Sequence, residues 1–164
     1  MRRLTLALLI ALATTLPAQA RPTFVGTWSL VTATGMDSTG KPRPMIGENP
    51  LGSISYTADG HMAAQLYDSH RPKLGATPAT ADPALARVAF LGLTTYFGRY
   101  TLDTVAHTVS HHVDGAMNPE WIGHTLVRSY RFLPGDRLEL TVVTNYDGRK
   151  PARPGVLVWQ RVGK

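Results

Sequence analysis

The chain has 164 residues and no cysteine, so it cannot form disulfides and its stability must come from core packing, which a single domain of this size can supply. The formal net charge is +6, an excess that favours association with anions in general. The lysines and arginines are scattered along the chain, whereas nucleic-acid binding needs them clustered among exposed aromatics, so the composition argues against a nucleic-acid partner.

Residues 1–20 have the three regions of a secretory signal peptide. Arg2-Arg3 precede the apolar run Leu4 to Leu12, and the segment ends in the small-residue pattern Ala18-Gln19-Ala20. The apolar run is shorter than the ~20 residues that a membrane-spanning helix needs, and no later stretch is apolar enough. We therefore expect cleavage after this segment, a periplasmic or secreted domain over 21–164, and no stable membrane span.

Three strands are predicted in the first part of this domain. Runs rich in β-branched and aromatic residues, bounded by turn formers, cover 24–34, 51–57 and 61–67. The segment from Pro42 to Pro50 is predicted to be an irregular loop. Asp59-Gly60 supplies the positive φ that a tight hairpin requires, so the second and third strands should form a hairpin.

One helix is predicted, beginning at Asp82-Pro83. The aspartate suits the N-cap, and the proline suits the first helical position, where its missing N–H is not needed. Leu85, Val88, Ala89 and Gly92 follow at helical spacing and form one apolar stripe. A single helix after three strands indicates a lid or plug on a sheet rather than a crossover, because parallel sheets alternate strands and helices repeatedly.

Five more strands are predicted in the second part of the domain, with at most one helical turn at Asn118 to Trp121. Their ranges are 95–102, 104–113, 124–133, 137–144 and 156–162. Eight short runs joined mostly by short turns favour an all-β, closed, antiparallel up-and-down barrel with one helix inserted between strands three and four. The interior of such a barrel can hold one small ligand.

Four motifs occur in order along the domain. They are Phe24-Val25-Gly26-Thr27-Trp28, Tyr56 to Leu66, Tyr96-Phe97-Gly98-Arg99-Tyr100, and His111 to Gly123. With them the chain resembles the bacterial and fungal lipocalin-like domain family from about Phe24 to Val162. The first motif contains the Gly-x-Trp pattern that opens lipocalins, and Arg161 on the last strand is a candidate to pack over that tryptophan. The resemblance implies an eight-stranded calyx, but the family as a whole has no single assigned activity.

A mostly aromatic pocket with a few polar groups is the usual make-up of a ligand site. The candidate ligand-binding residues are Gln65, Tyr67, Tyr96, Tyr100, His112, Asn118, Trp121 and Arg128. An inward Arg128 would be a buried cation that needs a partner, which would favour a carboxylate-bearing or phenolic ligand. The alternative, Arg128 on the outer wall, stays open, because a register error of one residue exchanges the two faces of a strand. Core packing alone is the alternative explanation for most of the aromatics.

The histidines suggest a second kind of site. His111 and His112 are adjacent and so point to opposite faces of a strand, which prevents both from ligating one metal. A zinc or copper site that combines His107, His111, His124 and Glu120 is conceivable. Because the chain lacks cysteine and a compact His-x-His pattern, we expect no metal and no cofactor.

Three hypotheses for function follow. The first is an exported barrel that binds a small, largely apolar or weakly anionic molecule. The second is an enzyme of isomerase or cyclase type in which His112, with Tyr67 or Tyr100, moves a proton. The third is an envelope interaction module with a filled barrel and a basic surface. The sequence contains no nucleophile elbow, phosphate loop or paired-carboxylate pattern, so it gives no support to hydrolysis.

Overall fold

The computed structural model describes residues 23–163, so the predicted signal peptide lies outside the described residues. β-Strands are the main regular structure of the described part, as predicted. The elements in chain order are β1 (Gly26–Met36), β2 (Pro42–Pro44), β3 (Pro50–Tyr56), β4 (His61–Asp68), α1 (Pro83–Leu91), β5 (Leu93–Asp103), β6 (Thr108–Ala116), the 3-10 helix η1 (Pro119–Trp121), β7 (Thr125–Leu133), β8 (Arg137–Val142) and β9 (Val156–Arg161).

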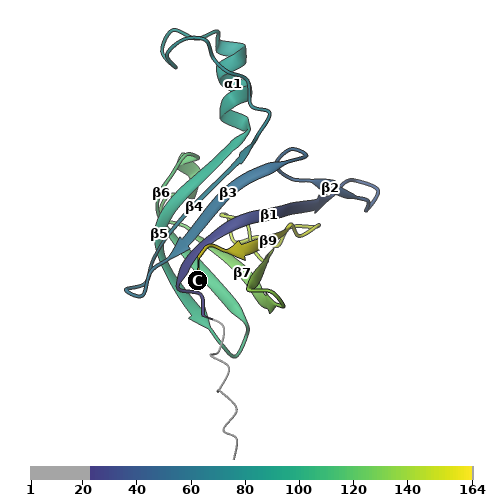
Figure 1. The fold of residues 1–164 in the computed structure, drawn as a ribbon, viewed down its shortest axis with the longest axis vertical. Helices are drawn as coiled ribbons and strands as arrows, with labels where there is room; N and C mark the ends of the chain where they lie inside the picture. The colour runs from purple at the N-terminus through teal and green to yellow at the C-terminus, as the bar shows by residue number, and fades with distance from the viewer. Residues whose placement is uncertain (1–22, 164) are drawn as a thin grey trace, which may run out of the picture.

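The sheet closes into an antiparallel barrel of eight strands, β1 and β3 to β9 (Figure 1). Each strand pairs with the next, and β1 pairs with both β3 and β9. The pairing of β1 with β9 changes register between Leu30 and Thr32, which is the signature of a β-bulge. Bulges bend a strand and increase its twist, so this one helps β1 to follow two neighbours around the barrel. The predicted all-β, closed antiparallel barrel of eight strands is confirmed.

The predicted position of the helix needs a correction. The helix follows β4, the fourth strand, because β2 forms within the segment that was predicted to be an irregular loop. This strand pairs only with the end of β1, through Thr34 to Met36, and lies outside the ring of eight. Prolines are tolerated there because an edge strand leaves one side without ladder hydrogen bonds.

A second difference lies between β5 and β6. The predicted fifth strand began at Thr104, but the chain turns there and β6 begins at Thr108. The Asp103 carboxylate accepts hydrogen bonds from the amides of Val105 and Ala106, and His107 has a φ of 52°. These side-chain bonds hold a turn that competes with strand pairing.

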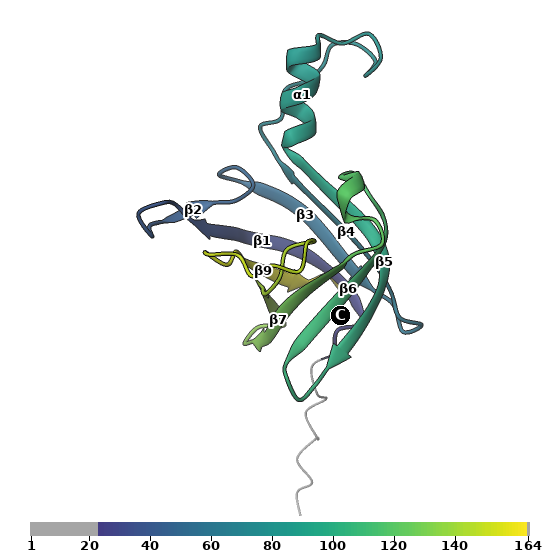
Figure 2. The same ribbon diagram turned by 180° about the vertical axis from the view of Figure 1, so that it is seen from behind.

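The helix α1 begins as predicted but does not cover the barrel. Asp82 Oδ1 accepts hydrogen bonds from the amides of Ala84 (2.8 Å) and Leu85 (3.1 Å), with Pro83 in the first turn. Both views of the ribbon show α1 extending away from the barrel, beyond the ends of β4 and β5 (Figures 1 and 2). Only Ala89 of the helix is buried. The expectation of a lid or plug is therefore wrong.

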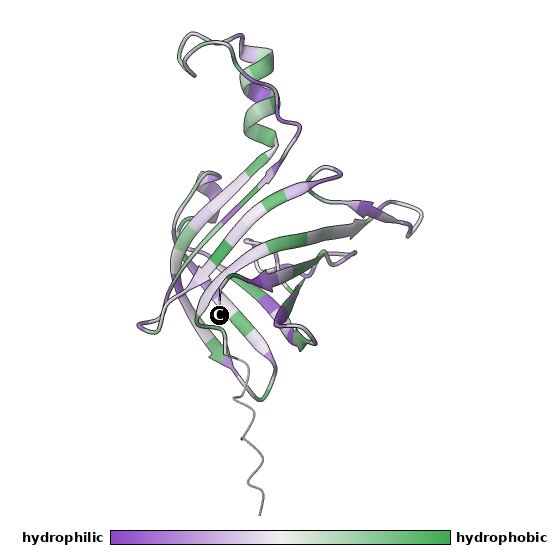
Figure 3. Cartoon of the chain, in the orientation of Figure 1, coloured by the Kyte–Doolittle hydropathy of each residue, from purple (hydrophilic) through white to green (hydrophobic). Residues whose placement is uncertain are grey.

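Apolar side chains of α1 are exposed as a result. Leu85, Val88, Phe90 and Leu91 are each at least 41% exposed, and the helix carries much of the apolar colouring at that end of the molecule (Figure 3). The buried core lies instead inside the barrel and follows the alternation of the strands, as with Met62, Ala64 and Leu66 on β4.

The end of the barrel opposite α1 is sealed by aromatic rings. Phe24 packs edge-to-face against Tyr56, Tyr130 and Phe132, with ring centroids 4.7–5.4 Å apart. The Trp28 indole N–H donates to the carbonyl of Phe24 (2.9 Å). These packed rings fill the interior at this end of the barrel.

The predicted stacking of Arg161 on Trp28 is confirmed, since the guanidinium carbon lies 4.0 Å from the centroid of the indole ring. Arg161 Nη1 also donates to the carbonyl of Val25 (2.8 Å), and Nη2 donates to that of Thr23. Gly26 is required in this arrangement, because a Cβ there would lie 2.7 Å from Arg161 Nη1. The glycine and the tryptophan of the Gly-x-Trp pattern are therefore the two residues of β1 against which Arg161 of β9 packs.

Candidate functional site

A cavity of about 200 Å³ lies inside the barrel. Its walls are mostly aliphatic and aromatic, with Thr94, Tyr96, His111 and Arg128 as the polar side chains apart from the Trp indoles. The lining residues are Met45, Ile46, Ile54, Leu66, Thr94, Tyr96, His111, Trp121, Arg128, Leu140, Val142, Leu157 and Trp159. Among the described residues, no aspartate or glutamate contributes to this lining.

His111 links two tyrosine hydroxyls beside this cavity. Its Nε2 lies 2.9 Å from the hydroxyl of Tyr56 on β3, and its Nδ1 lies 3.0 Å from the hydroxyl of Tyr96 on β5. All three side chains are buried. Gly98 lets β5 and β6 approach closely enough for this contact, since a Cβ at that position would collide with the carbonyl oxygen of His112.

The three groups are neutral at physiological pH. Burial, together with the positive charge of Arg128 and the electrostatic effect of the neighbouring His112, lowers the pKa of His111 to about 3. Burial raises the pKa of Tyr56 well above 10 and also raises that of Tyr96, while the charge of Arg128 partly opposes both shifts. The network is therefore a set of neutral hydrogen bonds.

Arg128 on β7 points into the barrel, which settles the orientation that the sequence left open. Its Nη1 donates to the carbonyls of Val127 (2.9 Å) and Thr144 (3.0 Å). None of the ion pairs found within residues 23–163 includes Arg128. Two carbonyl dipoles thus hold the guanidinium in place, and the charge itself has no carboxylate partner in that part of the chain.

Trp121 stands at the mouth of the cavity. Its ring packs edge-to-face on Tyr96, with centroids 5.6 Å apart, and it follows Asn118, whose side chain caps η1 by accepting from the Glu120 amide (3.1 Å). Trp121 and Thr94 also line an outer recess of about 270 Å³, together with Phe90, Leu91, Leu93, Thr95, Met117 and Asn118. The cavity and the recess thus share two residues of their walls.

The structure brings together only part of the predicted site. Tyr96, Trp121 and Arg128 line the cavity, and Asn118 lies in the adjoining recess. Tyr100 packs on Tyr56, with ring centroids 4.9 Å apart, and its hydroxyl donates to the carbonyl of Thr57 near the sealed end.

The other three predicted residues lie on the outer face and do not line the cavity. Gln65 and Tyr67 alternate with the buried residues of β4, and Tyr67 lies under the guanidinium of Arg71 at 5.9 Å. The ring nitrogens of His112 lie 3.0 Å from the hydroxyls of Thr101 and Thr125. The enzymatic hypothesis placed its acid–base group at His112, which lies outside the cavity.

Sequence reasoning missed His111 and Trp159 as cavity residues, and it missed Tyr56 as the hydrogen-bond partner of His111. A signal for His111 was present, because it shares its strand face with the apolar Val109 and Val113, whereas His112 has polar neighbours at that spacing. Residues two apart on a strand share a face, so the apolar pair marks the buried side.

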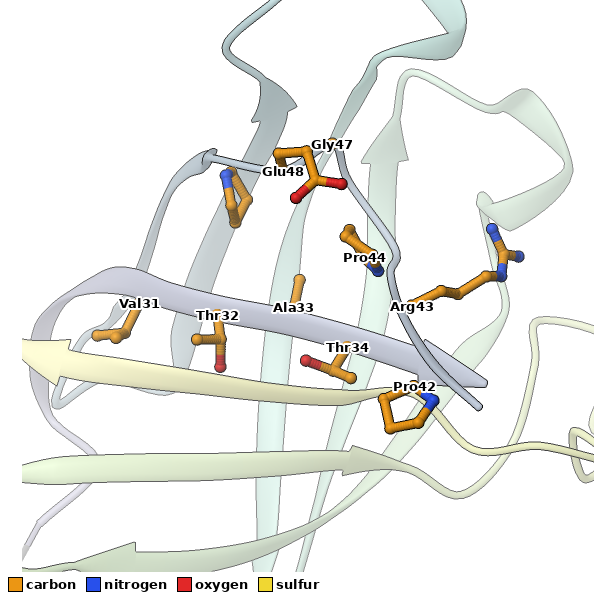
Figure 4. A pocket seen from close by; sticks show the side chains of 10 residues that line it. Val31, Thr32, Ala33, Thr34, Pro42, Arg43, Pro44, Gly47 and Glu48 are labelled. Atoms are coloured by element: carbon orange, nitrogen blue, oxygen red, sulfur yellow. The ribbon is translucent and has the colours of Figure 1, made fainter. Parts of the chain in front are cut away.

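Another recess, of about 260 Å³, lies outside the barrel between β1 and the segment from Pro42 to Pro50 (Figure 4). The side chain of Arg43 extends away from the other labelled residues, so the charged groups do not converge on one point. Within residues 23–163, no three histidine, aspartate or glutamate side chains form a group able to hold a metal ion. No helix in that range is long and apolar enough to cross a membrane.

Comparison with known proteins adds one match. A family model described as a lipocalin-like domain matches residues 25–162, a range that contains every strand of the barrel. No curated protein matches the chain in a sequence search.

Proposed function

Because this chain belongs to the lipocalin-like domain family, we propose that it binds a small, largely apolar molecule inside its barrel. The observation that carries the proposal is the interior cavity with its aliphatic and aromatic walls. Burying apolar surface stabilises a complex by roughly 25 cal/mol per Å², so such walls favour an apolar ligand. At about 200 Å³ the cavity is smaller than the ~300–1,000 Å³ of most drug-sized sites, which favours a small molecule.

The surroundings of Trp121 support a route into the cavity. The recess outside it shares Thr94 with the cavity wall, and another recess, of about 300 Å³, shares Met45, Ile46 and Thr94. Both lie near the C-terminal end of α1, where Leu91 lines each of them. A ligand that enters here would pass exposed apolar side chains before it reaches the interior.

The proposed function includes export, on the strength of residues 1–20 alone. The mature protein would then meet its ligand in the periplasm or outside the cell. Of the other two hypotheses, a filled barrel is disfavoured by the cavity. In the enzymatic hypothesis, His111 would have to replace His112 as the group that moves a proton, because His111 is the histidine that lines the cavity. This role is also disfavoured, because His111 is neutral and both of its ring nitrogens are hydrogen-bonded.

The test is native mass spectrometry of the protein purified gently from its own host, followed by denaturing extraction of anything that co-migrates. We expect a protein mass without residues 1–20 and a stoichiometric small molecule. The variant Val142→Phe, which places a larger side chain in the cavity wall, should lose this molecule.

The matched control is Leu51→Phe, at a 51% exposed position on β3, which should keep the molecule. Overpacking costs about 1–3 kcal/mol, so the melting temperature of each variant is measured to confirm that it folds. Retention of the molecule by both folded variants would show that the interior is not the binding site.

A further inference from the structure

Trp159, a residue of the cavity wall, carries a hydrogen-bond donor without an acceptor in the described part of the chain. Trp159 is 1% exposed and lines the cavity, and its Nε1 is buried with no hydrogen-bond partner among residues 23–163. Leaving a buried donor unpaired costs free energy, because the group has lost its bonds to water. An acceptor atom on a bound molecule would remove this cost.

Tyr96 supplies a second donor, which follows from the tautomer of His111. A neutral imidazole has one N–H and one acceptor nitrogen. The Tyr56 hydroxyl is fully buried, and within the described residues its only hydrogen bond is to His111 Nε2. The least costly arrangement has Tyr56 donating to Nε2, because its hydrogen has no other acceptor there. His111 Nδ1 then carries the proton and donates to the Tyr96 oxygen, which leaves the Tyr96 hydroxyl hydrogen for the cavity.

Arg128 supplies a third donor and a positive charge. Its Nη1 is bonded to two carbonyls, while its Nη2 and Nε have no hydrogen-bond partner among residues 23–163. A half-buried cation without a counter-charge is costly. Because no carboxylate of the described chain lines the cavity, a counter-charge has to come from the bound molecule.

From these three donors we propose that the ligand is a small apolar acid whose carboxylate meets Arg128, Tyr96 and Trp159, while its apolar part fills the rest of the cavity. This inference rests on the proposed function and names the class of ligand. A carboxylate offers two acceptor oxygens that suit the guanidinium fork. One arginine balances one negative charge, so a monocarboxylate fits better than a phosphate dianion.

The experiment compares acids with their matching alcohols at pH 7 by isothermal titration calorimetry. The probes are phenylacetate, benzoate and hexanoate, each paired with its primary alcohol, which keeps the apolar part and removes the charge. Charge-assisted hydrogen bonds contribute about 1.5–3 kcal/mol, so the acid should bind at least about tenfold more tightly than its alcohol.

Variants locate the source of this preference. Arg128→Gln should reduce the affinity for the acid to that for the alcohol, and Arg128→Lys should restore part of the preference because it keeps the charge. Tyr96→Phe should weaken binding of the acid several-fold. Arg131→Gln, on the same strand but 67% exposed, is the matched control and should leave both affinities unchanged.

The possible results separate the class of ligand from the proposed function. Equal binding of acid and alcohol by the unaltered protein, or a preference that survives in Arg128→Gln, would overturn the carboxylate and leave the proposed function standing. Failure of every probe to bind, with nothing co-purified from the host, would overturn both. If only a co-purified molecule binds, an acid supports this inference and a neutral compound overturns it.

Discussion

His111 lies between two tyrosines that come from other strands. Its hydrogen bonds connect β3, β5 and β6 across the interior, where each bond is shielded from water. Buried polar networks that are fully satisfied stiffen a core and fix its geometry. We infer that His111 acts mainly as a neutral connector that orients the Tyr96 hydroxyl.

The buried His111 predicts a pH-dependent stability. In the folded chain its pKa is about 3, against an ordinary value of 6.5, so between these values the unfolded chain binds a proton that the folded chain does not. The contribution of His111 to stability is therefore complete above about pH 6.5 and is lost as the pH falls toward 3. Urea unfolding at pH 7, 6, 5 and 4 should show a decreasing free energy of unfolding.

The control for this prediction is His111→Gln, because glutamine can donate and accept but does not titrate in this range. Its free energy of unfolding should change less between pH 7 and 4 than that of the unaltered protein. Parallel pH dependence in the two proteins would show that other groups cause the loss.

For single residues, the sequence predicted the residue types of the cavity better than it predicted which side chains point into the barrel. The inward positions of Tyr96, Trp121 and Arg128 agree with the expected aromatic pocket. His112 was chosen over His111, although the apolar Val109 and Val113 mark the face of His111 as the buried one. The contact of His111 with Tyr56, 55 residues away, could not be predicted from the sequence.

Among the elements, α1 stands apart from the barrel. Its cap is satisfied locally by Asp82, while its side chains, apart from Ala89, are not buried. Local signals of this kind are readable from sequence because the interacting residues are neighbours. The direction in which the helix leaves the sheet depends on distant contacts, and so it was not predictable.

The isolation of α1 leads to a prediction for Asp82→Ala. Loss of an N-cap destabilises a helix by about 0.5–2 kcal/mol. Because α1 contributes only Ala89 to the buried residues, we expect faster amide exchange within Pro83–Leu91 and an unchanged melting temperature. Hydrogen-exchange mass spectrometry with a thermal scan measures both.

Asp82→Asn is the control, since asparagine also caps helices well, and it should exchange like the unaltered protein. A fall of several degrees in the melting temperature of Asp82→Ala would mean that the helix is coupled to the barrel.

The strands were predicted more completely than the helix position. Strong alternation and turn residues located seven of the eight barrel strands within a few residues. The exception is β6, for which Thr104 to His107 were wrongly assigned to the strand. Their β-forming residues outweighed the single Asp103 whose side chain holds the turn. The strand β2 was missed because two of its three residues are proline, which normally argues against a strand.

For the molecule as a whole, closure depends on pairing between the first and last strands. β1 and β9 are joined along Trp28 to Thr34, and Arg161 from β9 covers Trp28 from β1. Eight short antiparallel runs were enough to predict closure, because a barrel satisfies every strand edge. The volume left inside was not predictable, since it depends on how all the side chains pack together.

This closure predicts the effect of Arg161→Met. The substitution keeps the apolar stem but removes the guanidinium over Trp28 and its bonds to the carbonyls of Thr23 and Val25. A cation–π contact contributes about 0.5–2 kcal/mol and a hydrogen bond about 0.5–1.5, so we expect a loss of about 1–3 kcal/mol by urea unfolding.

The control is Arg131→Met, which removes an arginine that is 67% exposed and paired with Glu139. Surface ion pairs contribute about 0–1 kcal/mol, so its effect should be small. Equal losses in the two variants would show that the contact with Trp28 adds no particular stability.

The pairing of β1 with β9 also brings the beginning and the end of the described chain together at the sealed end, where the amide of Val162 donates to the carbonyl of Thr27 (Figure 1). The cavity mouth faces the opposite direction. A fluorophore, surface anchor or fusion partner attached at the C-terminus would thus leave ligand access unobstructed. A circular permutant that joins the two ends by a short linker and is cut within residues 72–80 would keep every barrel strand intact.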